Sequence, residues 1–175
     1  KKLNLNNSDK VILFVAADTN DERKGIRYIL DIIPKCNEYK FISIGKKIEN
    51  VEFDNLIQLG YISNRKLINE IYSISDVFVI PSLDDNFPTT VIEAFANSTP
   101  VIGFNQGGIP EQVTSDVGEI IYDISSSGLK NGIDNILKND KRREILSVNC
   151  RKKFEELYTY DKFLKNYFKI YDKLI

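Results

Sequence analysis

Short apolar runs that alternate with one-sided helical patterns are the feature that most limits how this chain can fold. Val11–Ala17 reads VILFVAA, a continuous apolar run of the kind found in strands that are covered on both faces. Further strand-like runs are at 40–45, 56–61, 76–82, 100–104 and 118–122. Because such strands are typical of parallel sheets, each is expected to lead into a crossover connection.

Apolar residues at helical spacing fill the gaps between these runs. The patterns are at 26–33, 67–74, 91–96 and 129–137. Pro34 is expected to end the first helix, and Pro88 suits the first residue of the third. The alternation predicts an α/β fold: a Rossmann-like, doubly wound parallel sheet of about six strands, flanked by helices and joined by right-handed crossovers.

The composition changes from about Lys141, and two C-terminal helices are expected at 141–157 and 160–175. The second carries a broad apolar stripe made of Phe163, Leu164, Tyr167, Phe168 and Tyr171. This stripe has two interpretations. It packs on the same domain, or part of it docks on a segment that this chain lacks.

Charge and composition exclude several classes of protein. The chain has 175 residues, of which 42% are apolar and 28% charged, so it can build an ordinary globular core. Its 24 basic and 25 acidic residues leave a net charge of −1, so nucleic acid is not expected as a partner. The chain has no His, which excludes His-based catalysis and His metal ligands within it. Cys36 and Cys150 are expected to be reduced thiols, in keeping with a cytoplasmic protein.

The chain opens with KKLNLNNSDK, which contains no Met and no apolar stretch after the lysines. We therefore expect no signal peptide, and no run approaches the roughly 18 apolar residues of a membrane span. We also expect the chain to be a fragment of a longer protein.

Ligands of a doubly wound sheet bind beyond the carboxyl ends of its strands, where the strand order reverses. The loops that could hold a ligand are therefore 18–25, 45–50, 61–65, 82–88 and 104–111.

The segment Pro81–Pro100, PSLDDNFPTTVIEAFANSTP, carries the most chemistry. Asp85 lies in the loop before a helix, and Glu93 lies about two turns along that helix, away from its apolar stripe. The free N–H groups from Thr89 onward form an anion site, to which Pro88 contributes none. On spacing alone, the segment is better interpreted as an acidic turn followed by a helix with a solvated Glu.

The same segment resembles the signature of family 4 of the retaining glycosyltransferases, within the domain that binds the nucleotide sugar. The family pattern is Glu-x7-Glu between Pro-Ser and a Pro-Val-Ile strand. The matching residues are Pro81, Ser82, Asn86, Phe87, Pro88, Val91, Ile92, Glu93, Ala94, Pro100 and Val101. The sequence departs from the pattern at Asp85, usually Glu, and at Ser98, usually Gly.

The resemblance implies roles for these residues. Glu93 would hold the ribose hydroxyls of the nucleotide, and Asp85 would face the transferred sugar as a catalytic residue. The backbone near the sugar and the phosphates would come from Asn86, Phe87, Pro88, Thr89 and Thr90.

Arg23-Lys24-Gly25 also resembles the family, in which a Lys-Gly pair at the start of the first helix brings a cation to the donor diphosphate. Lys24 would act as a catalytic residue because a fixed cation stabilises the charge that the leaving diphosphate gathers. The family often has a second Arg a few residues earlier, where this chain has Ala17–Asn20 and no cation. Arg23 could replace it. Without the resemblance, the segment would be a solvated basic pair.

Two further loops resemble the family. Tyr61 and Ile62 lie in a Gly-Tyr-Ile-Ser segment whose backbone would meet the nucleotide base. Gly107–Glu111 matches a Gly-Gly-x-Pro-Glu loop, in which glycines allow close approach of the backbone. The matches span roughly 11–157 and follow the family's order.

The resemblance implies that this chain is the C-terminal, donor-binding domain of a GT-B-fold enzyme whose N-terminal acceptor domain is absent. Such an enzyme transfers a hexose from a UDP- or GDP-sugar with retention, needs no cofactor or metal, and builds glycans such as bacterial surface polysaccharides. It would lie in the cytoplasm, and the resemblance leaves room for peripheral association with the inner face of the membrane.

Two alternatives stay open. One is a regulatory α/β domain with a degenerate nucleotide pocket, which Asp85 and the missing Arg favour. The other is a sugar epimerase or a phosphorylase. An epimerase would often use His in its site. A phosphorylase would need a Lys that bears pyridoxal, and Lys24 lies in the wrong kind of loop for this role.

Overall fold

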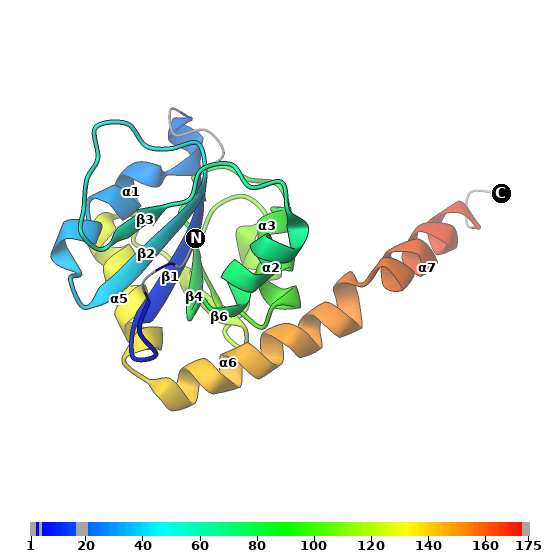
Figure 1. The fold of residues 1–175 in the computed structure, drawn as a ribbon. Coiled ribbons are helices and arrows are strands. Elements are labelled where there is room, and N and C mark those ends of the chain that lie inside the picture. The colour runs from blue at the N-terminus through cyan, green and yellow to red at the C-terminus, as the bar shows by residue number, and fades with distance from the viewer. Residues whose placement is uncertain (1–2, 4, 17–20, 173–175) are drawn as a thin grey trace.

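The computed structural model describes residue 3, residues 5–16 and residues 21–172, with the backbone alone at residue 16. Its centre is a six-stranded sheet in the order β3-β2-β1-β4-β5-β6, and every adjacent pair is parallel (Figure 1). The strands are β1 (Lys10–Ala16), β2 (Tyr39–Gly45), β3 (Leu56–Gln58), β4 (Val77–Ile80), β5 (Val101–Phe104) and β6 (Gly118–Ile121). The predicted α/β fold is therefore confirmed.

Helices cover both faces of this sheet. They are α1 (Ile26–Leu30), α2 (Arg65–Ser73), α3 (Thr89–Ala96), α4 (Ile109–Gln112), α5 (Ser126–Leu137), α6 (Asp140–Lys153) and α7 (Tyr160–Tyr171). Two 3-10 turns, η1 (Glu22–Lys24) and η2 (Ile33–Lys35), and a π-helical turn, η3 (Phe154–Tyr158), complete the described elements. Pro88 lies one residue before α3, as its N-cap, rather than at the first helical position.

Strand β1 shows why the apolar runs are continuous. Ile12 and Phe14 face a core that α1 and α5 cover, whereas Val11 and Leu13 face a second core beneath α2 and α3. All four side chains are almost completely buried. Each such side chain contributes about 1.5–3 kcal/mol relative to exposure to water, so both faces of the strand must be apolar.

The strand order reverses between β1 and β4. From β1 the chain first builds β2 and β3 on one side, and then returns to place β4, β5 and β6 on the other. The loops after β1 and β4 therefore leave neighbouring strands at the same edge of the sheet. Part of the expected loop after β1, residues 17–20, lies outside the described residues.

Several expected boundaries were wrong. The first helix ends at Leu30 rather than 33, and Pro34 lies within the 3-10 turn η2. The third strand stops at Gln58 rather than 61, and Gly60 beyond it has a left-handed φ of 74°. The loop at 104–111 contains α4, because Pro110 lies in its first turn, where a proline is well tolerated. The helix expected at 141–157 ends at Lys153, and a π-helical turn follows it.

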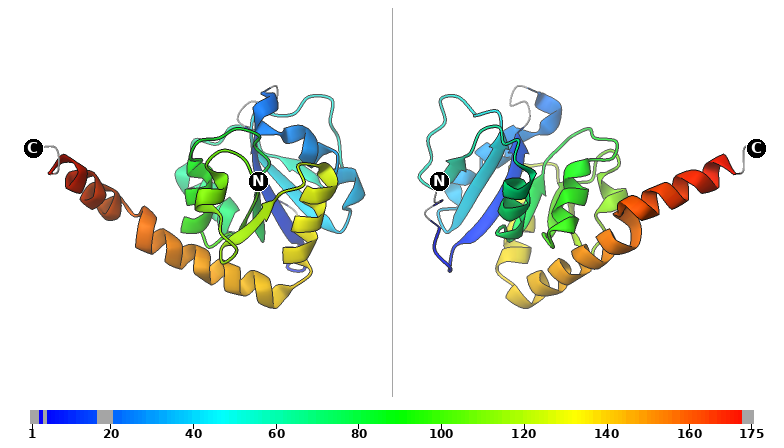
Figure 2. Two further views of the ribbon diagram at one scale, coloured as in Figure 1. Left: turned by 180° about the vertical axis from the view of Figure 1, so that it is seen from behind. Right: turned by 45° about the vertical axis from the view of Figure 1, so that its right-hand side comes forward.

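The C-terminal helix α7 leaves the domain after η3 and projects away from it (Figures 1 and 2). No residue of α7 is buried, and its exposed aromatic or aliphatic side chains are Tyr160, Phe163, Tyr167, Phe168, Ile170 and Tyr171. The interpretation that this stripe packs on the same domain is therefore wrong.

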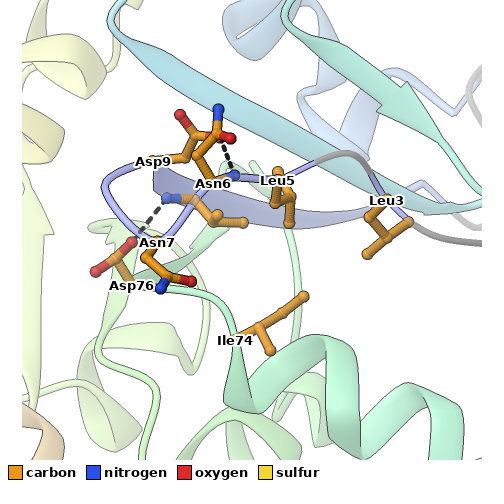
Figure 3. Close-up of a pocket in the computed structure, with 8 residues that line it drawn as sticks. Leu3, Leu5, Asn6, Asn7, Asp9, Ile74 and Asp76 are labelled. Atoms are coloured by element: carbon orange, nitrogen blue, oxygen red, sulfur yellow. Dashed lines mark hydrogen bonds between the residues drawn. The ribbon is translucent and has the colours of Figure 1, made fainter.

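An open cavity of about 870 Å³ lies at the amino edge of the sheet. Asn6, Asn7 and Asp9 line it together with Leu3, Leu5, Val11, Ile74 and Asp76 (Figure 3). It lies at the opposite edge from the loops that could hold a ligand, and the described residues that line it include no Lys or Arg.

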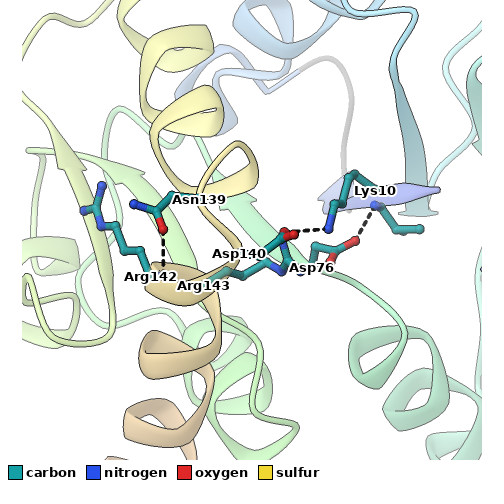
Figure 4. Close-up of polar contacts among 7 residues, drawn as sticks. Lys10, Asp76, Asn139, Asp140, Arg142 and Arg143 are labelled. Carbon is teal, nitrogen blue, oxygen red and sulfur yellow. Dashed lines mark hydrogen bonds and ion pairs between the residues drawn. The ribbon is translucent and has the colours of Figure 1, made fainter. Parts of the chain in front are cut away.

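An ionic network beside this cavity attaches α6 to the sheet (Figure 4). Asp76 accepts the N–H of Val11 at 2.7 Å and pairs with Arg143 at 3.1 Å. Asp140, at the start of α6, pairs with Arg143 and with Lys10, the latter at 2.9 Å. The network joins β1, the start of β4 and α6, so the Lys- and Glu-rich C-terminal region begins as part of this domain.

The turn after α3 holds a non-glycine residue in a left-handed conformation. Ser98 has a φ of 61°, and its N–H donates to Phe95 while that of Thr99 donates to Ala94. These two bonds form a Schellman motif, whose left-handed position is normally Gly. The departure from the family pattern at Ser98 therefore costs backbone strain.

We predict that Ser98→Gly raises the free energy of unfolding by about 1 kcal/mol, because it removes the clash of a Cβ in this conformation. Urea denaturation measures the change. Asn50→Gly is the matched control: Asn50 has a φ of 57°, but Asn tolerates this region, so its gain should be smaller. Equal or lower stability of the Ser98 variant would contradict the assignment.

Candidate functional site

Lys24 and Asp85 meet at the point where the strand order reverses. The Nζ of Lys24, at the end of η1, lies 2.9 Å from Oδ2 of Asp85 in the loop after β4. Their side chains are 35% and 18% exposed, so the ion pair lies at the mouth of the site rather than inside the core. The structure thus brings together the two residues that the sequence assigned to catalysis.

Gly25 holds the loops after β1 and β4 against each other. It has a φ of 62°, and a Cβ at this position would lie 1.9 Å from the carbonyl oxygen of Pro81. Beside it, the N–H of Leu83 donates to the carbonyl of Arg23 at 2.6 Å. A side chain at position 25 would separate the loops and move Lys24 away from Asp85.

The Gly-Gly loop after β5 supports the same segment from the other side. A Cβ at Gly108 would lie 1.7 Å from the carbonyl oxygen of Asn86, and one at Gly107 would lie 2.3 Å from that of Asp85. The N–H of Gly108 donates to the carbonyl of Asp85 at 2.8 Å. Three segments that are distant in the sequence therefore meet at one edge of the sheet.

A small cavity of about 90 Å³ lies between these loops. Its polar lining comes from Lys24, Ser82, Asp85 and Thr90, and Val15, Phe78, Val79, Ile80 and Pro81 complete it. The N–H groups of Thr89 and Thr90 begin α3 and have no hydrogen-bond partner among the described residues. One cation and the positive end of a helix thus lie beside the same cavity.

Glu93 lies one helical turn beyond Thr90, so the two side chains share a face of α3. Its carboxylate is exposed and does not line the small cavity. Tyr72, which is fully buried, donates its hydroxyl to Oε2 of Glu93 at 3.2 Å. Burial first, and the nearby carboxylate second, raise the pKa of Tyr72 well above its usual range, so the phenol stays a donor.

Arg23 forms its ion pair with Asp21 rather than with Asp85. Its guanidinium bonds to Asp21 at 2.8 Å, and this hydrogen bond is the main cause of the lowered pKa of Asp21. Asp21 also caps η1 by accepting the N–H of Arg23. In this structure Arg23 therefore helps to fix the turn that presents Lys24, rather than adding a second cation to the cavity.

The remaining predicted segment, which contains Tyr61 and Ile62, lies at the same edge of the sheet because it follows β3. Tyr61 is exposed, and Ile62 is partly buried against the core under α2. The N–H of Gly45, at the end of β2, donates to the carbonyl of Gly60 at 3.0 Å, which fixes the start of this segment.

Sequence reasoning missed two aromatic residues behind the site. One is Tyr72 beneath Glu93. The other is Tyr158 of η3, whose ring contacts Phe87 at 6.3 Å and Phe95 at 6.2 Å between centroids. Tyr72 lies in a helical pattern that indicates only a core position, and nothing in the sequence links Tyr158 to the loop before α3.

Residues 1–153 match the family model described as Glycosyl transferases group 1. The chain belongs to this family. Members of the family therefore provide the comparison for the site described above, and the match covers every element from β1 to α6.

The relatives are about twice as long as this chain. An uncharacterised glycosyltransferase of Methanocaldococcus jannaschii is 28% identical over 98% of this chain and 47% of its own length. The N,N'-diacetylbacillosaminyl-diphospho-undecaprenol α-1,3-N-acetylgalactosaminyltransferase of Campylobacter jejuni is 25% identical over 100% of this chain and 47% of its own. The chain thus spans about half the length of the curated relatives that it matches along its whole length.

Solved structures confirm the fold. Sucrose-phosphate synthase from Thermosynechococcus elongatus superposes with a TM-score of 0.86 at 23% identity, over 98% of this chain and 47% of that one. Anabaena HepE, solved in complex with UDP, gives a TM-score of 0.82 at 14% identity, over 95% of this chain and 49% of that one.

Among the helices of the described residues, none is both long and apolar enough to cross a membrane.

We predict that Gly25→Ala lowers the free energy of unfolding by about 3 kcal/mol, because the left-handed φ and the contact with the Pro81 backbone both oppose a Cβ. Gly60→Ala is the matched control. Gly60 has a φ of 74°, but its Cβ would meet nothing closer than 3.8 Å, so only the conformational cost of about 1 kcal/mol applies. Urea denaturation of both variants tests this. Equal losses would show that the contact between the loops adds nothing.

Proposed function

We propose that this chain is the C-terminal, donor-binding domain of a two-domain GT-B enzyme of the retaining family 4. The enzyme transfers a hexosyl group from a UDP- or GDP-sugar to an acceptor glycan or lipid-linked glycan. The observation that carries this proposal is the meeting of Lys24, Asp85 and the start of α3 where the strand order reverses.

The charges at this point suit a nucleoside diphosphate. The Lys24 ammonium and the N–H groups of Thr89 and Thr90 offer positive charge to the phosphates, and a carboxylate beside them would repel that group. The carboxylates of Asp85 and Glu93 instead suit hydroxyl groups, those of the transferred sugar and of the ribose respectively. The family resemblance implies the same assignment of positive groups to the phosphates and of carboxylates to the hydroxyl groups.

The donor must compete with Asp85 for Lys24. An ion pair between partly exposed side chains contributes only about 0–1 kcal/mol. A diphosphate carries more negative charge than one carboxylate and also binds the helix N-terminus, so it can displace Asp85. Once released, Asp85 is free to accept a hydroxyl of the transferred sugar.

The relatives support the proposed donor and the proposed kind of acceptor. HepE was solved with UDP. The Campylobacter relative is named for a diphospho-undecaprenol acceptor, and a 31% identical Klebsiella pneumoniae protein is described as lying in a cps region. We therefore propose assembly of surface polysaccharide or lipid-linked glycan, in the cytoplasm or at the inner face of the membrane.

Acceptor binding is assigned to a second domain. A transferase must hold donor and acceptor together, and this chain spans about half of its relatives. The exposed aromatic face of α7 supports this assignment, because a soluble domain rarely exposes an apolar stripe that has no partner.

A regulatory domain with a degenerate pocket is the second candidate. Two observations favour it. The ammonium of Lys24 is paired with Asp85, and the cavity beside them is only about 90 Å³. Nucleotide binding alone does not separate this candidate from the enzyme, whereas glycosyl transfer by the full-length protein does.

We predict that calorimetric titration detects binding of UDP or GDP, and that Lys24→Ala weakens it by about ten- to a hundredfold through loss of one charge-assisted contact. Lys141→Ala, an exposed lysine on α6 far from the site, is the control and should bind as the parent does. No heat with either nucleotide, or equal affinity in both variants, would contradict the site.

Residues 1–175 alone should transfer no sugar, and detectable transfer would contradict the assignment of the acceptor to another domain.

A further inference from the structure

Gln112, the last residue of α4, is a buried amide that the site has not yet used. Its side chain is fully buried, and its Nε2 donates to the carbonyl of Pro88 at 3.3 Å. Its Oε1 is also buried and has no hydrogen-bond partner in the described part of the chain. Since buried polar atoms without a partner destabilise a fold, stability alone is a poor reason for an amide here.

The carbonyl that Gln112 binds belongs to the peptide unit that opens α3. Pro88 is the N-cap of this helix, and its carbonyl also accepts the N–H of Val91 at 3.2 Å. A peptide unit is planar, so the Pro88 carbonyl and the Thr89 N–H point in opposite directions. A donor that fixes the carbonyl on the inner side therefore fixes the direction of the Thr89 N–H on the outer side.

Gln112 is itself anchored from two directions. Its main-chain carbonyl accepts Nζ of Lys153 at 2.8 Å, which ties α4 to the end of α6. At the other end of α4, the N–H of Gly108 donates to Asp85. The helix thus lies as a short support beneath residues 85–88, and Gln112 is the side chain through which this support reaches the start of α3.

We infer that Gln112 is a positioning residue: its contact with Pro88 aims the Thr89 N–H at the phosphates of the donor. This inference rests on the proposed function, because it requires a diphosphate at the start of α3. Gln112 does not touch the donor itself. It acts through the Pro88–Thr89 peptide, which could otherwise rotate about its flanking bonds and turn the N–H away.

The test is Gln112→Met, which keeps the shape of the side chain and removes both the donor and the unpaired oxygen. UDP affinity by calorimetry should fall about five- to tenfold, the effect of one misdirected hydrogen bond to a charged group. The thermal midpoint should stay the same or rise, because a buried unpaired atom is removed. The Thr89 amide resonance, which should shift on addition of UDP to the parent chain, should shift less in the variant.

Asn55→Leu is the matched control for a buried amide with a structural role. Asn55 is almost completely buried, and its side-chain amide donates to the carbonyls of Ile33 and Cys36, both at 2.9 Å. Its loss should lower the thermal midpoint and leave the UDP affinity of the folded protein unchanged. The two variants should therefore move stability and affinity in different ways.

The outcomes separate failure of this inference from failure of the proposed function. If the parent chain binds neither UDP nor GDP, the proposed function fails first. If the parent binds UDP and the Gln112 variant binds it equally well, the inference is overturned. It is also overturned if the variant loses stability as Asn55→Leu does while the Thr89 amide still shifts as in the parent.

Discussion

The contact between the backbone of Gly25 and the carbonyl of Pro81 is the constraint on which the candidate site depends. It brings together the loops that leave the two strands at the reversal of strand order. Only a residue without a side chain allows this approach, and only this approach places the Lys24 ammonium beside Asp85. The sheet determines where the candidate site lies. The absence of a Cβ at Gly25 determines how close Lys24 comes to Asp85.

The rest of the site is built on helix α3 and its supports. Asp85 and Asn86 are held by the Gly-Gly loop, Phe87 lies against Tyr158, and Glu93 receives the hydroxyl of Tyr72. These contacts come from the loop before α4, from η3 and from α2, segments that lie on both sides of α3 in the sequence. A ligand at this edge would therefore meet a backbone whose position is fixed by the core rather than by the ligand.

The strands could be predicted from the sequence, because burial on both faces leaves an unbroken apolar run such as Val11–Phe14 in β1. The extent of β3 could not, since an edge strand has few buried residues and ends where Gly60 turns the backbone. The exposure of α7 could not be predicted either. An amphipathic pattern shows that a helix has an apolar face, but it does not show what covers that face.

Within the site, the sequence placed Lys24 and Asp85 on loops of the same edge but could not show that they pair directly. Arg23 is the opposite case: the family resemblance suggested that it could replace a second cation, whereas it pairs with Asp21. The contact of Tyr72 with Glu93 could not be predicted, because a tyrosine at helical spacing indicates only a position in the core. Only three-dimensional contacts distinguish these roles.

The ionic network of Asp76, Arg143, Asp140 and Lys10 lies at the opposite edge of the sheet from the site. The ionic network and the candidate site therefore lie at opposite ends of the same strands. Substitutions in the loops of the candidate site can therefore leave this network intact, provided that they spare the glycines that join the loops. Through this separation, a single scaffold can present different side chains to a ligand while its strands stay joined in the same way.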